Sequence, residues 1–321
     1  HATHTHTGGP TWEGFSVLRD AAYLEKLTTA AAQAALQAYE NRKIAKFGAK
    51  TGRVSDITFI RRFYRPDGSV VTNPHPDDLN ITGTEGEPDE TFTLFKITDE
   101  ADQPIVFWSN FGLHLDTVAG TEISADYAGV LARKVHEHFG GNVMSLFMTG
   151  PCGNLNHLNR KNLKTYTDPN IKEEIGERIF AELLRLESEI QMDSDPYFET
   201  KTHTFTAKLR KPTEEETAYA RAILSGEVQE TASKMRDPKM FSKMLLAVAE
   251  YPYDETQIEL SCLKIGNAHM VAWPGEIFCD FGMEIRSEHP GEDFMIAELS
   301  NGSAGCYIPT KEAFSRGGYE P

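Results

Sequence analysis

Two histidines near the start of the chain have the residue type and spacing to bind a metal ion. His4 and His6 are two residues apart, and side chains at this spacing point to the same face of an extended strand. Gly8 and Gly9 would then turn the chain away. Neutral imidazole is a good zinc ligand, so two imidazoles on one face provide half of a tetrahedral site. A solvated polar terminus and the remnant of an expression tag are the alternative interpretations.

Three further places combine a polar side chain with the end of an apolar strand. Ligands bind at such strand ends in α/β sheets. The three are His114 after residues 105–108, Glu276 after a Pro-Gly pair, and Tyr307 after the glycine-rich residues 299–306. Two imidazoles and a carboxylate with an open position are the usual composition of a catalytic zinc site. Taken singly, a hydrogen-bonded core histidine and a charge at a helix N-terminus remain alternatives for His114 and Glu276.

Composition restricts the class of protein and of partner. The chain has 321 residues, 40% of them hydrophobic and 25% charged, which is enough for one large domain or two ordinary ones. The net charge of -16 argues against a nucleic-acid partner. No apolar run approaches the roughly 20 residues that span a bilayer. The four cysteines form no C-x-x-C pair, which argues against a zinc ribbon and favours free thiols.

The hydrophobic pattern alternates between strands and helices. We expect helices at residues 23–42, 124–139, 170–194 and 278–287, and strands at 44–54, 57–64, 91–97, 104–109, 143–148, 198–209, 257–265, 269–273 and 294–299. This alternation predicts an α/β fold, a layered mixed sheet with flanking helices. Residues 213–250 are charged and helical, so we expect a helical insertion or lid within a single domain over residues 1–321. The long polar loop 72–89 is expected at a pocket rim.

A set of motifs spread over most of the chain points to one family. The motifs are ATHTHTG at residues 2–8, GLH at 112–114, ISADYAG at 123–129, GNLN at 153–156, PGE at 274–276, YIPTKE at 307–312 and YE at 319–320. They resemble the THTHSG, second-histidine, ISGD, Gly-Asp-x-Ser-Pro-Asn, PGE, YVTTRE and YE segments of the neutral, non-lysosomal ceramidases. The resemblance implies a zinc-dependent hydrolase that cleaves an N-acyl amide bond with a zinc-activated water, acting on a small-molecule or lipid amide.

The resemblance also implies roles for individual residues. A zinc ion would be held by His4, His114, Glu276 and Tyr307. His6 and Tyr319 would face the substrate amide, and Arg61 is the nearest candidate for the family's arginine, although the preceding asparagine of the family is missing here. A phenolate ligand is chemically reasonable because a divalent cation favours the charged form of a group whose pKa is near 10. Alternatively, Tyr307 donates to a developing oxyanion as a neutral phenol.

The chain departs from the ceramidase pattern in three ways. It ends at the tyrosine motif, before the family's immunoglobulin-like domain; it has Asn154 in place of aspartate; and residues 66–89 match poorly. These departures put the lipid substrate in question. A zinc hydrolase for a smaller amide or ester, such as a carbohydrate derivative, and a metal-organised binding protein without catalysis are the alternatives.

The chain begins inside a motif without an initiator Met, so we expect a missing N-terminal segment. The family is often exported, and a secreted or periplasmic location is open.

Other polar residues near these motifs have open roles. His157 either lines the pocket or makes a loop hydrogen bond. Asp116 and Asp126 are candidates for orienting the metal-binding imidazoles, with a helix N-terminal charge as the alternative for Asp126. His136 and His138 lie on an expected helix and are interpreted as surface residues.

Overall fold

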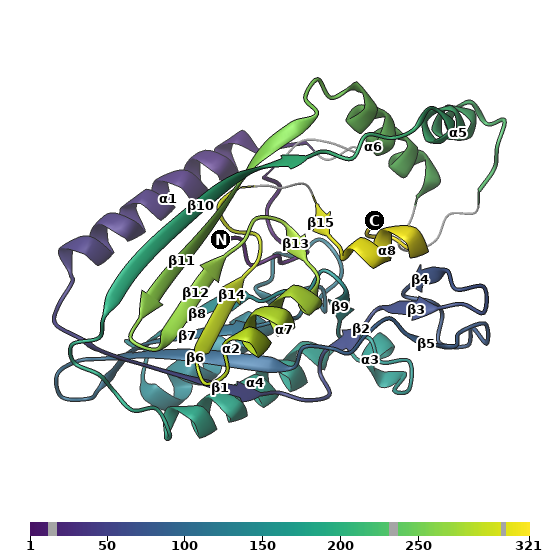
Figure 1. Cartoon of the computed structure of the whole chain (residues 1–321). Coiled ribbons are helices and arrows are strands. Elements are labelled where there is room, and N and C mark those ends of the chain that lie inside the picture. The colour runs from purple at the N-terminus through teal and green to yellow at the C-terminus, as the bar shows by residue number, and fades with distance from the viewer. Residues whose placement is uncertain (12–17, 231–236, 303–305) are drawn as a thin grey trace.

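Two four-stranded mixed sheets form the centre of the protein, which is described by a computed structural model over residues 1–11, 18–230, 237–302 and 306–321 (Figure 1). The first sheet has the order β1 (Lys46–Arg53), β6 (Thr91–Thr98), β7 (Pro104–Phe111) and β8 (Met144–Thr149). The second has the order β10 (Phe198–Lys208), β11 (Glu255–Ile265), β12 (Ala268–Ala272) and β14 (Asp293–Ala297). In each sheet the last pair is parallel and the others are antiparallel. The predicted layered α/β class is confirmed, with two sheets where one was expected.

The first sheet is covered on both faces. On one side α2 (Asp126–Phe139) and α4 (Ile171–Glu187) pack against it, and a core that includes Phe92, Phe107 and Ile179 is fully buried there. On the other side Phe95 meets Ala268 and Met295 of the second sheet. Burial on both faces explains why residues 105–108 of β7 read as a continuous apolar run in the sequence.

One buried amide fixes the two sheets relative to each other. Asn110, near the end of β7, donates from Nδ2 to the carbonyl of Met148 at 2.9 Å and to that of Ile296 at 3.0 Å. The Ile296 N–H donates back to Asn110 Oδ1 at 3.0 Å. The hydroxyl of Thr93 adds a bond to the carbonyl of Phe294 at 2.8 Å. These bonds bring the C-terminal ends of β7, β8 and β14 to one edge of the molecule.

Short elements surround this edge. They are β2 (Phe59–Ile60), β3 (Arg62–Tyr64), β4 (Val70–Thr72), β5 (Gly83–Thr84), β9 (Leu155–Asn156), β13 (Glu276–Ile277), β15 (Tyr307–Ile308), α3 (Lys164–Thr167), α7 (Cys279–Glu288) and α8 (Lys311–Arg316). The single strand expected at residues 57–64 is therefore wrong, because β2 and β3 are separated at Arg61. The expected loop at 72–89 is mostly loop, but it contains the short strand β5.

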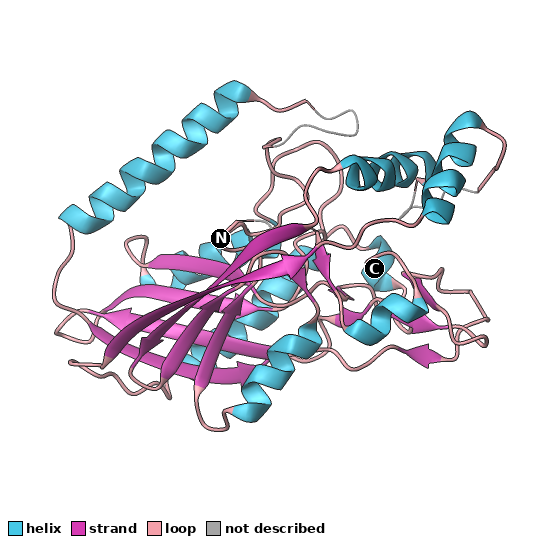
Figure 2. Cartoon of the chain, turned by 45° about the horizontal axis from the view of Figure 1, so that its top comes forward, coloured by secondary structure: helices cyan, strands magenta, loops and turns pink. Residues whose placement is uncertain are grey.

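Three helices lie outside the two-sheet core. Helix α1 (Ala21–Glu40) buries none of its residues and stands apart from the sheets (Figure 2). Helices α5 (Glu214–Ser225) and α6 (Pro238–Glu250) come between β10 and β11, where the helical insertion was expected, and residues 231–236 lie outside the described part of the chain. Thr213 and Glu216 form a capping box that starts α5. The assignment of residues 1–321 to one domain stays a prediction. Among the described helices, none is both long and apolar enough to cross a bilayer.

Candidate metal centre

Four remote segments meet at the shared edge of the two sheets. The N-terminal segment runs beside the chain after β7, where Thr5 bridges Leu115 and the His6 N–H donates to the Leu115 carbonyl at 2.9 Å. Glu276 of β13 pairs in parallel register with Tyr307 of β15. The segments containing His4 and His6, His114, Glu276 and Tyr307 are thereby brought to the same edge, although they are far apart in the sequence.

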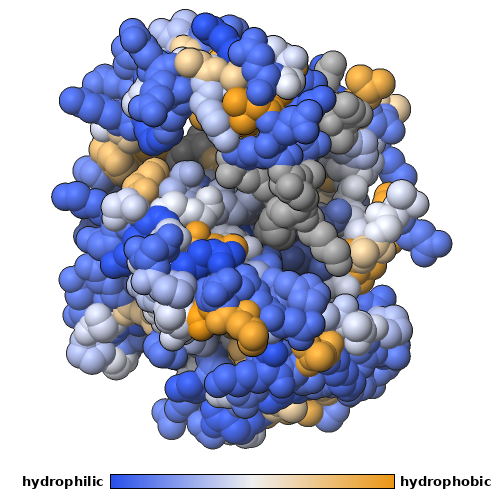
Figure 3. Space-filling view, turned by 90° about the vertical axis from the view of Figure 1, so that its right-hand side faces the viewer, coloured by the Kyte–Doolittle hydropathy of each residue, from blue (hydrophilic) through white to orange (hydrophobic). Residues whose placement is uncertain are grey.

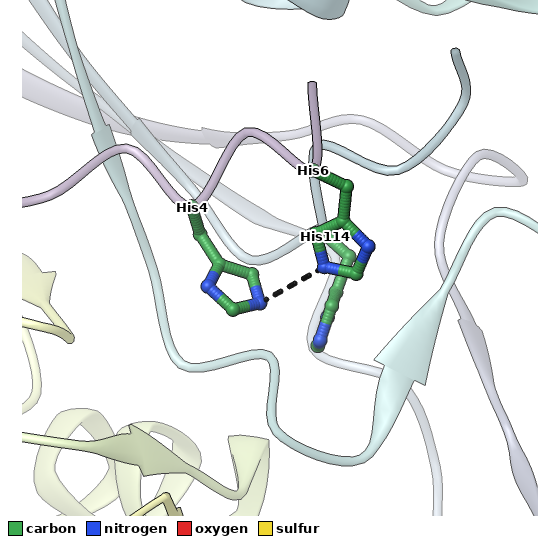
Figure 4. A group of neighbouring side chains, drawn as sticks. All are labelled: His4, His6 and His114. Carbon is green, nitrogen blue, oxygen red and sulfur yellow. Dashed lines mark hydrogen bonds between the residues drawn. The ribbon is translucent and has the colours of Figure 1, made fainter. Parts of the chain in front are cut away.

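Three imidazoles, those of His4, His6 and His114, come together (Figure 4). The carboxylate of Glu276 lies beside two of them. Nε2 of His4 lies 3.3 Å from Nε2 of His6 and 3.3 Å from Oε2 of Glu276. Nε2 of His114 also lies 3.3 Å from Oε2 of Glu276. Zinc bonds to nitrogen and oxygen of about 2.0–2.1 Å place tetrahedral ligands roughly 3.3–3.4 Å apart. The observed spacing therefore fits a divalent cation.

The hydrogen bonding of these groups points to the same conclusion. Glu276 is largely buried, and its Oε2 has no hydrogen-bond partner among the described residues despite the two nearby imidazoles. A buried polar atom without a partner costs about 1–3 kcal/mol, and more when it is charged. A cation between the carboxylate and the imidazoles would satisfy this oxygen.

The protonation states also suit a metal. Burial lowers the pKa of His114 to about 4, and the neighbouring Arg61 contributes to the shift, so His114 is neutral at pH 7 with a lone pair available. Burial opposes ionisation of Glu276, but His114 and His4 hold the pKa of its carboxyl below the usual range. Neutral imidazole and ionised carboxylate are the forms that bind zinc.

The backbone at His4 differs from the expected extended strand. His4 has a φ of 65°, in the left-handed region, and the described residues around it form one isolated β-bridge, from Thr5 to Leu115, in place of a strand. Positive φ is uncommon for residues other than glycine, although histidine is among the enriched exceptions. The side chains of His4 and His6 lie close together, as expected. The left-handed turn at His4 brings them together, and the expected extended strand is not formed.

The side chain of Arg61 lies next to His114 at the candidate metal centre. It does so because Arg61 interrupts the expected strand, between β2 and β3. Its Nη2 donates to the Gly153 carbonyl at 2.7 Å, and its Nη1 lies 3.3 Å from Nε2 of His114. Its guanidinium carbon lies 5.2 Å from the ring centre of Tyr307 and 5.8 Å from that of Tyr319. The cation is buried, which disfavours its charge, but Tyr307 and Glu320 raise its pKa overall.

The two tyrosines lie beside Arg61. Their ring centres are 5.5 Å apart, and burial raises the pKa of both phenols, most strongly that of Tyr307. Without a cation, Tyr307 is therefore a neutral phenol that can donate a hydrogen bond. Ligation by Tyr307 would require a divalent cation to remove the phenol proton. Both roles of Tyr307 stay predictions, and residues 303–305 of the preceding loop lie outside the described part.

Two further acidic residues have different roles from those expected. Asp116 pairs with His157, whose Nδ1 lies 3.0 Å from Asp116 Oδ1, and no hydrogen bond to a metal-site imidazole is seen among the described residues. This contact holds the pKa of Asp116 below its usual range although burial opposes ionisation. Asp126 accepts from the backbone N–H of Thr117 at 2.9 Å and closes the loop before α2. Of the two alternatives for Asp126, the structure supports the charge in the first turn of α2, and among the described residues its carboxylate bonds to no imidazole. His136 and His138 are exposed, as expected.

Asn154, which replaces the aspartate of the ceramidase pattern, has a structural role. Its Oδ1 accepts from the N–H of Cys279, the first residue of α7, at 2.9 Å, and its Nδ2 donates to Asp280 at 3.0 Å. An amide is suited to this position because it accepts and donates at once. The departure therefore affects the start of α7 and leaves the candidate metal ligands unchanged.

Sequence reasoning missed Glu320. This buried carboxylate accepts from Arg61 Nε at 2.8 Å through one oxygen, and from Arg62 Nη1 at 2.5 Å and Thr72 Oγ1 at 2.9 Å through the other. It thereby fixes the guanidinium that lies next to His114. The adjacent arginines of FIRR and the glutamate of the YE motif were visible in the sequence, but their separation of more than two hundred residues hid the pairing.

The buried thiols lie close to the same edge. All four cysteines are free, as the favoured interpretation of the sequence required, but only Cys152 and Cys279 are buried and Cys306 is exposed. The thiol of Cys152 donates to Glu298 at 3.0 Å, and its backbone N–H donates at 3.1 Å. Burial raises the pKa of Glu298 well above its usual value.

Comparison with known proteins identifies the fold. No family model matches the sequence, and no curated protein matches it. The neutral ceramidase from Pseudomonas aeruginosa is similar in structure, with a TM-score of 0.62 and 18% identity over 92% of this chain and 51% of that one. A ceramidase complexed with C2 is similar with a TM-score of 0.52 and 16% identity, over 86% of this chain and 50% of that one.

The chain therefore has the fold seen in neutral ceramidase structures and spans about half the length of those chains. The resemblance predicted from the motifs is confirmed at the level of the fold. At this identity the likeness concerns the fold, and the site rests on the geometry of this chain's own residues.

Substitution of Glu320 tests the buried ion-pair network. We expect Glu320→Gln to lower the free energy of unfolding by about 3 kcal/mol, because the buried guanidinium of Arg61 loses its carboxylate partner and that of Arg62 keeps only Glu85. Chemical denaturation of Glu320→Gln and of Glu312→Gln provides the measurement and the control, since Glu312 is exposed. Equal stability of the two variants would contradict the network.

Proposed function

We propose that the protein is a zinc-dependent hydrolase that cleaves an N-acyl amide bond. The observation that carries this proposal is the 3.3 Å spacing of Glu276 Oε2 from Nε2 of both His4 and His114, on a ceramidase fold. His4, His114, Glu276 and Tyr307 are the proposed ligands. A zinc ion held there would supply a water of lowered pKa and polarise the scissile carbonyl.

His6 is the residue best placed to exchange a proton with the substrate. It is the exposed member of the three imidazoles, and its Nε2 lies 3.3 Å from Nε2 of His4. Imidazole has a pKa near neutrality and can accept and return a proton during one turnover. In the proposed reaction, His6 delivers a proton to the nitrogen of the leaving amine.

Arg61 and Tyr319 are proposed to stabilise the charge that develops on the carbonyl oxygen. The guanidinium of Arg61 is held by Glu320 and by the Gly153 carbonyl, so it needs no reorganisation during the reaction. The raised pKa of Tyr319 keeps its phenol protonated and able to donate. Fixed donors in a site with little water are effective because their orientation does not change as the charge forms.

Metal content tests the proposed ligand set. We expect His114→Ala and Glu276→Ala each to abolish zinc binding, because each removes a donor from a four-ligand site. His6→Ala should retain one zinc ion per chain, since His6 is assigned to the substrate. Elemental analysis of the purified variants gives the answer, with the exposed His136→Ala as the control. One zinc ion retained in both His114→Ala and Glu276→Ala would refute the site.

Removal of one hydroxyl tests the role of Tyr319. We expect Tyr319→Phe to keep its zinc and to lose about a hundredfold in kcat, the usual effect of losing one oxyanion donor. Release of fatty acid from ceramide and from a short N-acyl amide would be followed in parallel, with Tyr253→Phe, an exposed tyrosine, as control. Turnover at the unmodified rate would remove Tyr319 from the mechanism. The relative rates on the two substrates separate a lipid amidase from a hydrolase of smaller amides.

A further inference from the structure

Strand β10 forms an outer edge of the second sheet (Figure 1). Among the described strands, it is hydrogen-bonded to β11 alone. Nine of its eleven residues are exposed, and the other two are partly exposed. A long exposed edge with free backbone N–H and C=O groups is a template for pairing with another strand. The edge at β10 is therefore a candidate interaction surface.

The edge of the first sheet at β1 is covered by the chain itself. Phe47 and Asp193 exchange two backbone hydrogen bonds, of 2.9 and 2.8 Å. A side chain at Gly48 would collide with Ile190, which shows how closely this segment lies against β1. Among the described residues, no such pair of backbone bonds covers the outer edge of β10. The two edges are thus different, and β10 is the one left open.

Charge restricts where two copies of the chain can meet. The net charge of -16 makes the copies repel each other. Strand β10 is close to neutral, because its charged residues are Glu199, Lys201 and Lys208, and the first two form an ion pair at 3.2 Å. On the face shown in Figure 3, hydrophobic side chains lie in separate small groups among hydrophilic ones. Pairing through a strand edge requires no large apolar face, since main-chain hydrogen bonds provide much of the affinity.

The sequence of β10 is self-complementary about its central residue, His203. When two copies of the strand pair antiparallel with His203 opposite its own counterpart, all eleven residues have an opposing residue. Threonine then faces threonine and lysine faces an aromatic ring, and both kinds of cross-strand pair are stabilising. No lysine opposes a lysine in this register. The pairs are Phe198 with Lys208, Glu199 with Ala207, Thr200 with Thr206, Lys201 with Phe205 and Thr202 with Thr204.

We propose that two copies of this chain associate through their β10 strands, antiparallel and centred on His203. The two second sheets, of four strands each, would then form one continuous sheet of eight strands. The rings of Phe198 and Phe205, which are 63% and 39% exposed, would be covered by the aliphatic parts of lysines from the second copy. The inference does not depend on the proposed amidase function.

Two double variants at the same positions test the association and its register. In Thr202→Lys/Thr204→Lys, lysines oppose lysines across the two-fold axis, so we expect the dimer dissociation constant to rise by about tenfold or more. In Thr202→Lys/Thr204→Glu, each lysine opposes a glutamate of the second copy, so the dimer should persist. Sedimentation velocity over a range of concentrations gives the dissociation constants, and circular dichroism checks folding. A monomeric unmodified chain, or equal behaviour of the two variants, would overturn the inference.

A cross-link at the two-fold axis provides an independent test. Directly opposing residues of an antiparallel pair have Cα atoms about 4.5–5.5 Å apart, which is within the range of a disulfide. We expect His203→Cys to form a covalent dimer on mild oxidation, with the disulfide located at position 203 by mass spectrometry. Leu79→Cys, at a position that is 94% exposed and outside β10, is the control and should stay unlinked. Failure of His203→Cys to cross-link, or equal cross-linking of Leu79→Cys, would contradict the proposed register.

Discussion

A buried carboxylate without a counter-charge is the constraint on which the site depends. Glu276 is held ionised next to two imidazoles, of which His114 is neutral because burial depresses its pKa. Arg61 is close by, but its donors are already bonded to Glu320 and to the Gly153 carbonyl. An unpaired charge in a buried site is costly. A divalent cation bound there would balance this charge, and the 3.3 Å spacing of the donors suits one.

The fold supplies this arrangement through the register of its two sheets. The Asn110 amide links β7 and β8 to β14, so the chain segments that leave these strands emerge at one edge. His114 follows β7, and the N-terminal segment is held against the same stretch by its bridge to Leu115. Glu276 and Tyr307 are aligned by the short parallel pair β13 and β15. Rigid strand ends thus hold side chains that loops alone would leave mobile.

Part of the site could be predicted from the sequence and part could not. His4, His6, His114 and Glu276 were predictable because each carries a recognisable local motif at a strand end or beside glycine. The left-handed turn at His4 was not, since local propensity disfavours it and tertiary contacts impose it. The strand break at Arg61 was hidden for a similar reason, because residues 57–64 read as one β-rich run. Ion pairs between distant residues, such as Arg61 with Glu320, leave no periodic signal.

The fold likewise has features that local sequence patterns predict and features that depend on contacts between distant residues. Alternating strands and helices predicted a layered α/β protein, because burial on one or two faces leaves a periodic pattern. The division into two sheets depends on pairing partners, and pairing between distant strands cannot be read from the pattern of either strand alone. The helices α5 and α6 were predictable as helices, whereas the hollow that they form with Tyr319 depends on how they pack against the C-terminal residues.

In the proposed site, nitrogen and oxygen atoms of this chain bind one divalent cation. X-ray absorption at the zinc edge of the zinc-loaded protein tests it most directly. We expect one zinc ion per chain, surrounded only by nitrogen and oxygen at about 2.0–2.1 Å, with imidazole scattering visible beyond them. A shell of sulfur at about 2.3 Å would assign the metal to cysteines, and failure to bind zinc would leave Glu276 without its proposed partner. Either result would contradict the proposed metal centre.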